Sequence, residues 1–410
     1  MRLATLALLA CVAGVVVTAV LTVPFPVLAG AHPHVDVLRD FTPGQVARER
    51  AYHAAIRPPA YLSLVIGLVL AAVLGLTGLG ARLVGGLPGH WTVKAFGGTA
   101  LVMALGQVAT LAFDVQAERV LRRYGLSTQT WTGWTNDQLR GLGIKAVTSG
   151  LVVVIVLTLV RKLPTTWWAW GGLAAGALVL LGSVAYPVVV EPAFNHFTSL
   201  PAGQLRTDLL ALAASDHVPV KDVLVADASR RTTALNAYVS GFGSTRRIVV
   251  YDTLIRDATP QEVELVVAHE LGHAKQDDVL HGTILGAFGA AAGICALYLL
   301  LSWPALLRRV GASSAGDPRI VPLVLFLAAL APLLISPLTN LVSRHIEARA
   351  DLHSLDLTGD LDTYISSEQR LSRTNLSDLE PGTVVYQLFF THPSGPERIA
   401  LAREWQRLHR

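Results

Sequence analysis

The sequence contains little cysteine, few charged residues and no long run of basic residues. Its two cysteines, Cys11 and Cys295, both lie within apolar runs, so neither a disulfide framework nor a cluster of thiolate metal ligands is expected. Charged residues make up 15% of the chain and the formal net charge is only +4, with the basic residues spread among the connecting segments. Without a basic patch interleaved with aromatic residues, no nucleic-acid partner is expected.

Apolar residues, in contrast, are abundant. They make up 52% of the chain, and the mean hydropathy is +0.49, which indicates an integral protein of the lipid bilayer. Seven apolar runs are long enough to span a membrane: Leu3–Leu28, Ala60–Gly80, Ala95–Phe113, Ala146–Val160, Trp167–Val190, Gly282–Leu301 and Ile320–Leu338. The first is too long for the apolar core of a signal peptide and lacks a cleavage site after it, so we interpret it as a spanning helix. Seven spans place the two ends of the chain on opposite sides.

The polar segments between these runs suggest an orientation. Segments 31–59, 114–145 and 191–280 and the tail after Asn340 share one side in a seven-span arrangement, and that side carries more positive charge in total. By the positive-inside rule it faces the cytoplasm. We therefore expect a multi-pass protein of the cell (inner) membrane whose largest polar segment is cytoplasmic. Tyr124, Trp131 and Trp134 are typical of residues that anchor a helix at the headgroup level.

The largest polar segment contains a small unit of helix and sheet. Leu205–Ala214 has helical periodicity, and Asp222–Ala226, Thr233–Val239 and Arg246–Tyr251 are typical of strands, the last two joined by a Gly-rich turn at 241–244. We interpret the strands as a meander. An extended peptide can add itself to an exposed edge of such a sheet through backbone hydrogen bonds.

A metal-binding motif follows this unit. In His269-Glu270-Leu271-Gly272-His273, the two imidazoles are four residues apart and share one face of a helix, where both can bind a single metal ion. The sequence also predicts where this helix starts, because Thr259 is a typical N-cap, Pro260 suits the first turn and Glu262 completes a capping box. Zinc suits two neutral imidazoles and one carboxylate, and it leaves a position open for water. Glu270 is then placed to accept a proton from that water.

The third ligand is expected beyond the seventh apolar run. Asn340, Arg344, Glu347 and Asp351 recur at helical spacing, so they form one polar face at the end of a spanning helix. We predict Glu347 as the third zinc ligand and Asp351, one turn on, as the hydrogen-bond acceptor of a ligand imidazole. The alternatives are that these charges form a solvated helix end, or that His345 or His353 is the ligand.

These motifs together resemble the type I CAAX prenyl endopeptidases, which are seven-span zinc metalloproteases of membranes. The resemblance rests on HELGH followed by a distant Asn-x-x-Ser-Arg-x-x-Glu-x-x-Ala-Asp, on Asn236-Ala237-Tyr238, on Asn375-Leu376-Ser377-Asp378 and on Thr391-His392-Pro393-Ser394 with Arg398. It implies one zinc ion per chain on His269, His273 and Glu347, with Glu270 as general base and acid. It further implies that Asn236 and Ala237 pair with the substrate backbone, and that His392 and Arg398 reach the active site. Arg344 and Asp278 are candidates for supporting contacts around the ligands; Asp277-Asp278 stand where eukaryotic relatives have Asn-His.

The sequence therefore predicts a mainly α, polytopic membrane protein of about seven spanning helices with a small α+β zincin-like domain. We divide it into spans and connectors (1–190), a catalytic insert (191–281), two further spans (282–338) and a C-terminal part of the catalytic domain (339–410). The expected activity is hydrolysis of peptide bonds in membrane-associated or lipidated, CAAX-like substrates. Alternatives are a site-2-type intramembrane protease, a membrane quality-control metalloprotease, or a channel or receptor with structural zinc.

Overall fold

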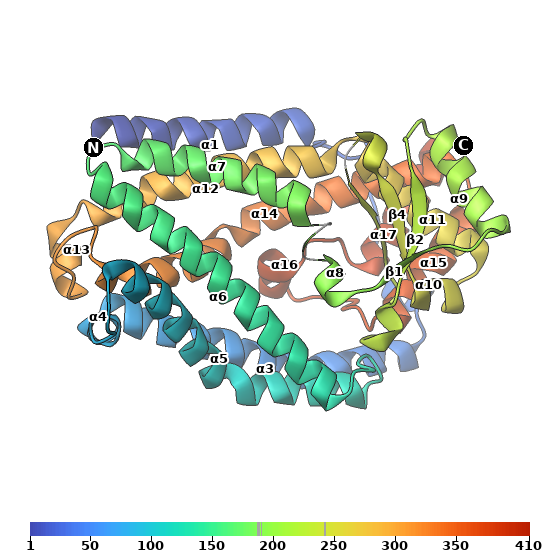
Figure 1. Ribbon diagram of the computed structural model, residues 1–410. Helices are drawn as coiled ribbons and strands as arrows, with labels where there is room; N and C mark the ends of the chain where they lie inside the picture. The colour runs from blue at the N-terminus through green and yellow to red at the C-terminus, as the bar shows by residue number, and fades with distance from the viewer. Residues whose placement is uncertain (187–188, 190, 242) are drawn as a thin grey trace.

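Helices dominate the computed structural model, which describes residues 1–186, 189, 191–241 and 243–410 (Figure 1). Within these residues seven helices are long and apolar enough to cross a membrane, as predicted. They are α1 (Arg2–Thr22), α3 (Pro43–Leu76), α5 (Trp91–Arg123), α6 (Trp131–Lys162), α7 (Trp167–Ala185), α12 (Asp278–Leu301) and α14 (Val321–Thr358). The predicted end of the fifth span at Val190 lies outside the described residues. Shorter helices connect them: α2 (Val37–Asp40), α4 (Gly78–Gly85), α8 (Glu191–Phe194) and α13 (Pro304–Arg309).

Two of the apolar runs extend beyond the helices that they form. The second was expected to continue to Gly80, but α3 ends at Leu76 and Thr77 caps the separate helix α4. The first apolar run was expected to continue to Leu28, but α1 ends at Thr22. Pro24 and Pro26 lack the amide N–H that a continuing helix requires, so the predicted helix extended too far toward Leu28. At the other end of the membrane part, α14 runs without a break from its apolar half to Gly359, which has the left-handed backbone typical of a helix terminator. The polar face that includes Glu347 is therefore rigidly continuous with a spanning helix.

The spanning helices pack side by side as a bundle. Helix α12 packs between α1 and α7, α5 packs against α3 and α6, and α14 packs against α3 (Figure 1). At the end of the bundle that holds α13, a buried apolar cluster that includes Trp167, Leu157 and Ile320 joins these helices. The two chain termini lie at opposite ends of the molecule, with the sheet at the end that holds the C-terminus (Figure 1).

The sheet has four strands in the order β1-β2-β4-β3. They are β1 (Phe197–Ser199), β2 (Asp222–Ala226), β3 (Ala237–Ser240) and β4 (Arg247–Tyr251). Strand β2 has the predicted bounds, but β1 was not predicted and β3 begins four residues later than expected. The meander was wrong as well, because β2 pairs with β4 in parallel and β3 pairs with β4 antiparallel. This order leaves β3 at an edge of the sheet.

One face of the sheet is covered by α9 (Gln204–Ser215) and by α11 (Pro260–Lys275), which carries the two histidines. Fully buried Leu209, Ile248, Val267 and Leu271 belong to the core that joins them. Because Val267 and Leu271 lie on the face of α11 that packs against the sheet, the opposite face of α11 is turned toward α14. The remaining helices, α10 (Asp252–Asp257), α15 (Leu361–Thr374), α16 (Thr383–Phe389) and α17 (Gly395–His409), complete this end of the molecule.

Candidate metal centre and active site

Helix α11 holds the two histidines in the predicted arrangement. Thr259 caps the helix, Pro260 lies in its first turn, and the side chains of Thr259 and Glu262 form the reciprocal hydrogen bonds of a capping box. One turn separates His269 from His273, and their Nε2 atoms are 3.1 Å apart. The local sequence is therefore sufficient to present both imidazoles on the same side of one helix.

Glu347 of α14 completes the group from 74 residues downstream of His273. Its Oε2 atom lies 3.2 Å from Nε2 of His269 and 3.5 Å from Nε2 of His273. Ligand atoms about 2.0 to 2.1 Å from a tetrahedral zinc ion are about 3.3 Å from one another, so the three side chains fit a single divalent ion. The rival ligands lie elsewhere: His345 contacts Leu341 O and the ring of Phe25, and His353 contacts Asp216.

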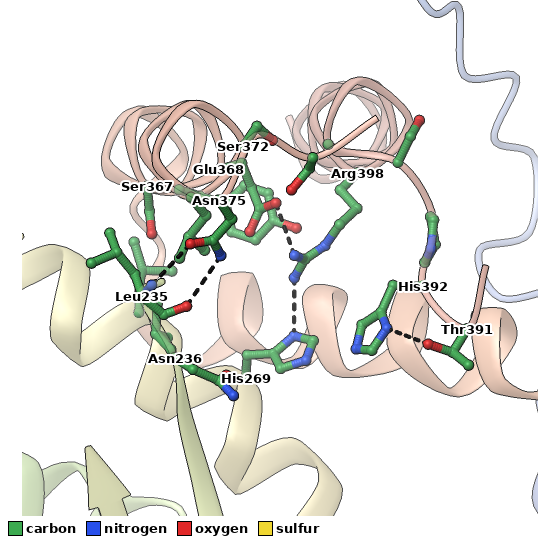
Figure 2. A pocket seen from close by; sticks show the side chains of 18 of the residues that line it. Leu235, Asn236, His269, Ser367, Glu368, Ser372, Asn375, Thr391, His392 and Arg398 are labelled. Carbon is green, nitrogen blue, oxygen red and sulfur yellow. Dashed lines mark hydrogen bonds and ion pairs between the residues drawn. The ribbon is translucent and has the colours of Figure 1, made fainter. Parts of the chain in front are cut away.

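Nδ1 of His269 contacts a series of buried charged residues, Asp351, Arg398 and Glu368, which we call the first support chain. Nδ1 lies 2.8 Å from Oδ1 of Asp351, and Oδ2 of Asp351 accepts a hydrogen bond of 2.9 Å from Nε of Arg398. Arg398 in turn forms an ion pair of 2.8 Å with Glu368 of α15 (Figure 2). Burial lowers the pKa of His269, but Asp351 and Glu347 outweigh it and raise the pKa to about 10.

His273 has a corresponding second support chain, built from different elements. Nδ1 lies 3.0 Å from Oδ2 of Asp278, at the start of α12. The other oxygen of Asp278 pairs with Arg349 of α14, and Arg349 Nη1 donates a hydrogen bond of 2.8 Å to Thr22 O at the end of α1. Burial lowers the pKa of His273, while Asp278 and Glu347 raise it to about 9. Both imidazoles are thus oriented from behind by an aspartate that is itself paired with an arginine.

Glu270 and His392 lie beside the three candidate ligand side chains. Burial raises the pKa of the Glu270 carboxyl, and the two neighbouring histidines oppose that rise. Nε2 of His392 is 3.3 Å from Oε1 of Glu347, and its Nδ1 is 2.8 Å from the hydroxyl of Thr391 (Figure 2). Glu270 and His392 line two adjacent cavities of about 420 and 460 Å³.

The two cavities meet beside the edge of β3. Asn236 lines both, Ala237 lines the larger one, and Leu235 and Asn375 line the smaller one. The larger cavity also contains apolar Val279, Leu280 and Ile346 from α12 and α14. An extended peptide lying along this edge would pass from one cavity into the other across Glu270 and His392.

Two of the predicted residues occupy positions that the sequence could not define. Arg398 lies behind His269, with Nη2 3.4 Å from Nδ1 of that ring, and so supports the ligand from the far side (Figure 2). Arg344 faces α16: its Nη1 donates to Tyr386 O at 3.2 Å and to Phe390 O at 2.8 Å. It therefore holds the segment that leads into His392, and the predicted polar face of α14 divides between this segment and the ligand group.

Sequence reasoning missed Arg349 and Glu368. Arg349 is two residues from both Glu347 and Asp351, so helical spacing excludes it from their shared face. Glu368 lies in an amphipathic helix whose charged residues otherwise suggest a solvated surface. Each was hidden because its partner comes from a distant part of the chain, and no local sequence pattern identifies that partner.

Comparisons with known proteins agree with this arrangement. The profile of peptidase family M48 matches residues 199–406, and the profile of the CAAX prenyl protease N-terminal region, described as five membrane helices, matches residues 41–196. An uncharacterized metalloprotease of Bacillus subtilis, YhfN, is 30% identical over 299 residues, which are 72% of this chain and 70% of that protein. The CAAX prenyl protease 1 homolog of Arabidopsis thaliana is 31% identical over 306 residues, 73% of this chain and 70% of that protein. The crystal structure of S. mikatae Ste24p superimposes with a TM-score of 0.80 at 20% identity, covering 97% of this chain and 98% of that one.

Proposed function

Because this chain belongs to the CAAX prenyl protease group of peptidase family M48, we propose that it cleaves peptide bonds in membrane-associated or lipidated proteins, with His269, His273 and Glu347 as metal ligands. The chain is a multi-pass membrane metallopeptidase, and its family implies a divalent metal ion. The proposed ion is zinc, one per chain, because two imidazoles and one carboxylate form a typical catalytic zinc set. The observation that carries the proposal is the convergence of these three side chains, whose candidate ligand atoms lie within 4.8 Å of one another.

A bound zinc ion supplies Lewis acidity, which activates water and polarises the scissile carbonyl. Glu270 adjoins His269 in sequence and lines both cavities, so it is placed to accept the proton of the attacking water and to pass it to the leaving amine. A pKa raised by burial suits a carboxylate that must release the proton again. His392 is placed to donate a hydrogen bond to the oxygen of the scissile carbonyl as negative charge develops there.

The supporting residues have separate tasks. Asp351 and Asp278 accept from Nδ1 of the two imidazoles and leave each Nε2 free for metal. Arg398 is proposed as a positioning residue of the His269 side, and Arg344 as the residue that positions the segment before His392. Ala237 is proposed to pair with the substrate backbone at the open edge of β3. The backbone of Asn236 faces β4 instead, because Asn236 O accepts a hydrogen bond of 3.0 Å from Tyr251 N, so backbone pairing of Asn236 with a substrate is not proposed.

The placement of α11 favours this function over intramembrane proteolysis of the site-2 type. Helix α11 is not among the spanning helices of the described chain; it is polar at its start and packs against the sheet. We place this catalytic end on the cytoplasmic side of the cell membrane, supported by the positive charge of the segments that join the spans there.

Glu270→Gln tests the proposal directly. We expect at least about a thousandfold loss of turnover with unchanged metal content, because the substitution removes the base without touching a ligand. The substrates are matched farnesylated and unmodified peptides, and the matched control is Glu264→Gln on the same helix. If wild type and Glu270→Gln cleave every peptide equally, the enzyme mechanism is excluded, as a structural metal in a channel or receptor would predict.

A further inference from the structure

The open edge of β3 is closed at one point by a side chain from α15. Neighbouring residues of a strand direct their backbone groups alternately to its two sides. Asn236 O accepts a hydrogen bond of 3.0 Å from Tyr251 N of β4, so Asn236 faces the sheet. Leu235, Ala237 and Val239 therefore direct their N–H and C=O groups to the open side.

Asn375 occupies both groups of Leu235. Its Oδ1 accepts a hydrogen bond of 2.9 Å from Leu235 N, and its Nδ2 donates one of 3.2 Å to Leu235 O (Figure 2). The carboxamide makes the pair of bonds that a residue of an added strand would make. Ala237 N contacts only the side-chain oxygen of its own neighbour, Asn236, in the contacts described, and an incoming strand can replace that local bond.

The direction of a bound peptide follows from this edge, on the premise of the proposed peptidase function. Antiparallel pairing is the more stable arrangement, and a peptide antiparallel to β3 runs from Val239 toward Leu235. Glu270 and His392 line both cavities at their junction near Asn236 and Ala237, which places the scissile bond there. Residues after that bond then enter the smaller cavity, where Asn375 lies.

We propose that Asn375 is a specificity-determining residue that ends sheet pairing just after the scissile bond. A peptide can pair with Val239 and Ala237 on its N-terminal side, but on its C-terminal side the next pairing position is taken. The rest of the smaller cavity, about 420 Å³ in volume, is lined on this side by side chains from α15 and from the segment that follows it, including Glu368, Ser372 and Ser377. The site therefore favours substrates with a short segment after the cleaved bond.

The test compares peptides that are identical before the scissile bond and carry one or four residues after it. The residue that would pair with Leu235 is the second after the bond when the residue before the bond pairs with Ala237, so only the longer peptide contains it. Wild type should gain nothing in kcat/KM from the longer segment. In Asn375→Ala, which frees both groups of Leu235, the ratio of long to short should rise about tenfold, because two backbone hydrogen bonds become available. Asn375→Asp keeps the acceptor and loses the donor, so it should raise the ratio about threefold and covers the case in which the alanine variant folds poorly.

Three controls make the experiment decisive. Ser377→Ala alters the same cavity without touching Leu235 and should leave the ratio unchanged. A scan of single N-methyl groups along the four residues should remove the gain at one position in Asn375→Ala and have no effect on the ratio in wild type. Binding of the same peptides is measured with proteins that also carry Glu270→Gln, so the length effect can be seen even if no peptide is cleaved. Absence of cleavage by wild type would contradict the proposed function but not the role of Asn375. Equal ratios for wild type and Asn375→Ala in both turnover and binding would overturn the proposal.

Discussion

The two support chains have the same sequence of groups, an imidazole, an aspartate and an arginine, but their residues come from different helices. Behind His269 lie Asp351, Arg398 and Glu368, all contributed by α14 and the C-terminal helices. Behind His273 lie Asp278 and Arg349, from the starts and ends of spanning helices, and the chain finishes at the backbone of α1. Both chains thus include a residue of α14, but only the second chain also reaches α12 and α1 of the membrane bundle.

The two chains also differ in burial. The side chain of Asp351 is 1% exposed and that of Arg398 15% exposed, against 10% for Asp278 and 21% for Arg349. A charge pair in a drier environment interacts more strongly, and it leaves a larger penalty when one partner is removed. The first chain should therefore matter more for both stability and metal affinity, whereas the second couples the metal centre to the position of α1.

The largest difference is expected for the two arginines. Arg398→Gln leaves Asp351 and Glu368 buried without their cation and should lower the free energy of unfolding by about 3 to 5 kcal/mol. Arg349→Gln removes the cation from one partly exposed carboxylate, and we expect a loss of only about 1 kcal/mol. Thermal unfolding of the purified proteins measures both. Arg407→Gln, which breaks the more exposed ion pair between Arg407 and Glu404 of α17, is the control and should change little; an equal loss in Arg398→Gln and Arg349→Gln would contradict the ranking.

The two aspartates should differ in their effect on metal affinity. Asp351→Asn and Asp278→Asn each replace the acceptor of a ligand imidazole, and such changes weaken metal binding by about 10 to 100-fold. We expect Asp351→Asn near the upper limit and Asp278→Asn near the lower one, because the His269 contact is shorter and drier. Competition with a chelator gives both affinities. A weaker effect of Asp351→Asn than of Asp278→Asn would show that the second support chain contributes more to metal binding than the first.

The two rings also differ in how they bind protons in the metal-free protein. The pKa values of about 10 for His269 and about 9 for His273 are above the ordinary value near 6.5, so protons compete with metal at neutral pH. Metal affinity should rise about tenfold per pH unit for each proton displaced between pH 7 and 9. The stability that the charged rings contribute without metal is complete below about pH 6.5 and is lost as the pH rises through 9 to 10. Titrations with metal across this range measure the slope, and a flat profile would contradict the raised values.

Local sequence was sufficient for the elements whose determinants are local. The helix that carries the histidines could be predicted with its start because Thr259, Pro260 and Glu262 satisfy its first N–H groups within one turn. Likewise, the seven spans follow from run length, and the third candidate ligand follows from helical spacing combined with the cost of polar side chains on a spanning helix.

Features that depend on distant partners could not be predicted. The position of β2 beside β4 is decided by the shared core with α9 and α11, and no strand pattern records it. The orientation of Arg344 toward α16 and of Arg349 toward Thr22 O depends on segments more than 35 residues away. Charged residues on a helix specify a face, but the neighbouring elements determine which buried group each one meets.

Metal analysis of three variants tests the central claim, that Glu347 completes a divalent metal site begun by His269 and His273. Wild type and Glu270→Gln should each carry about one metal ion per chain, and Glu347→Gln should carry less than about a tenth of that after dialysis. Asp356→Asn, which alters another carboxylate of α14, should bind metal as wild type does. A Glu347→Gln protein that keeps its full metal content would contradict the account.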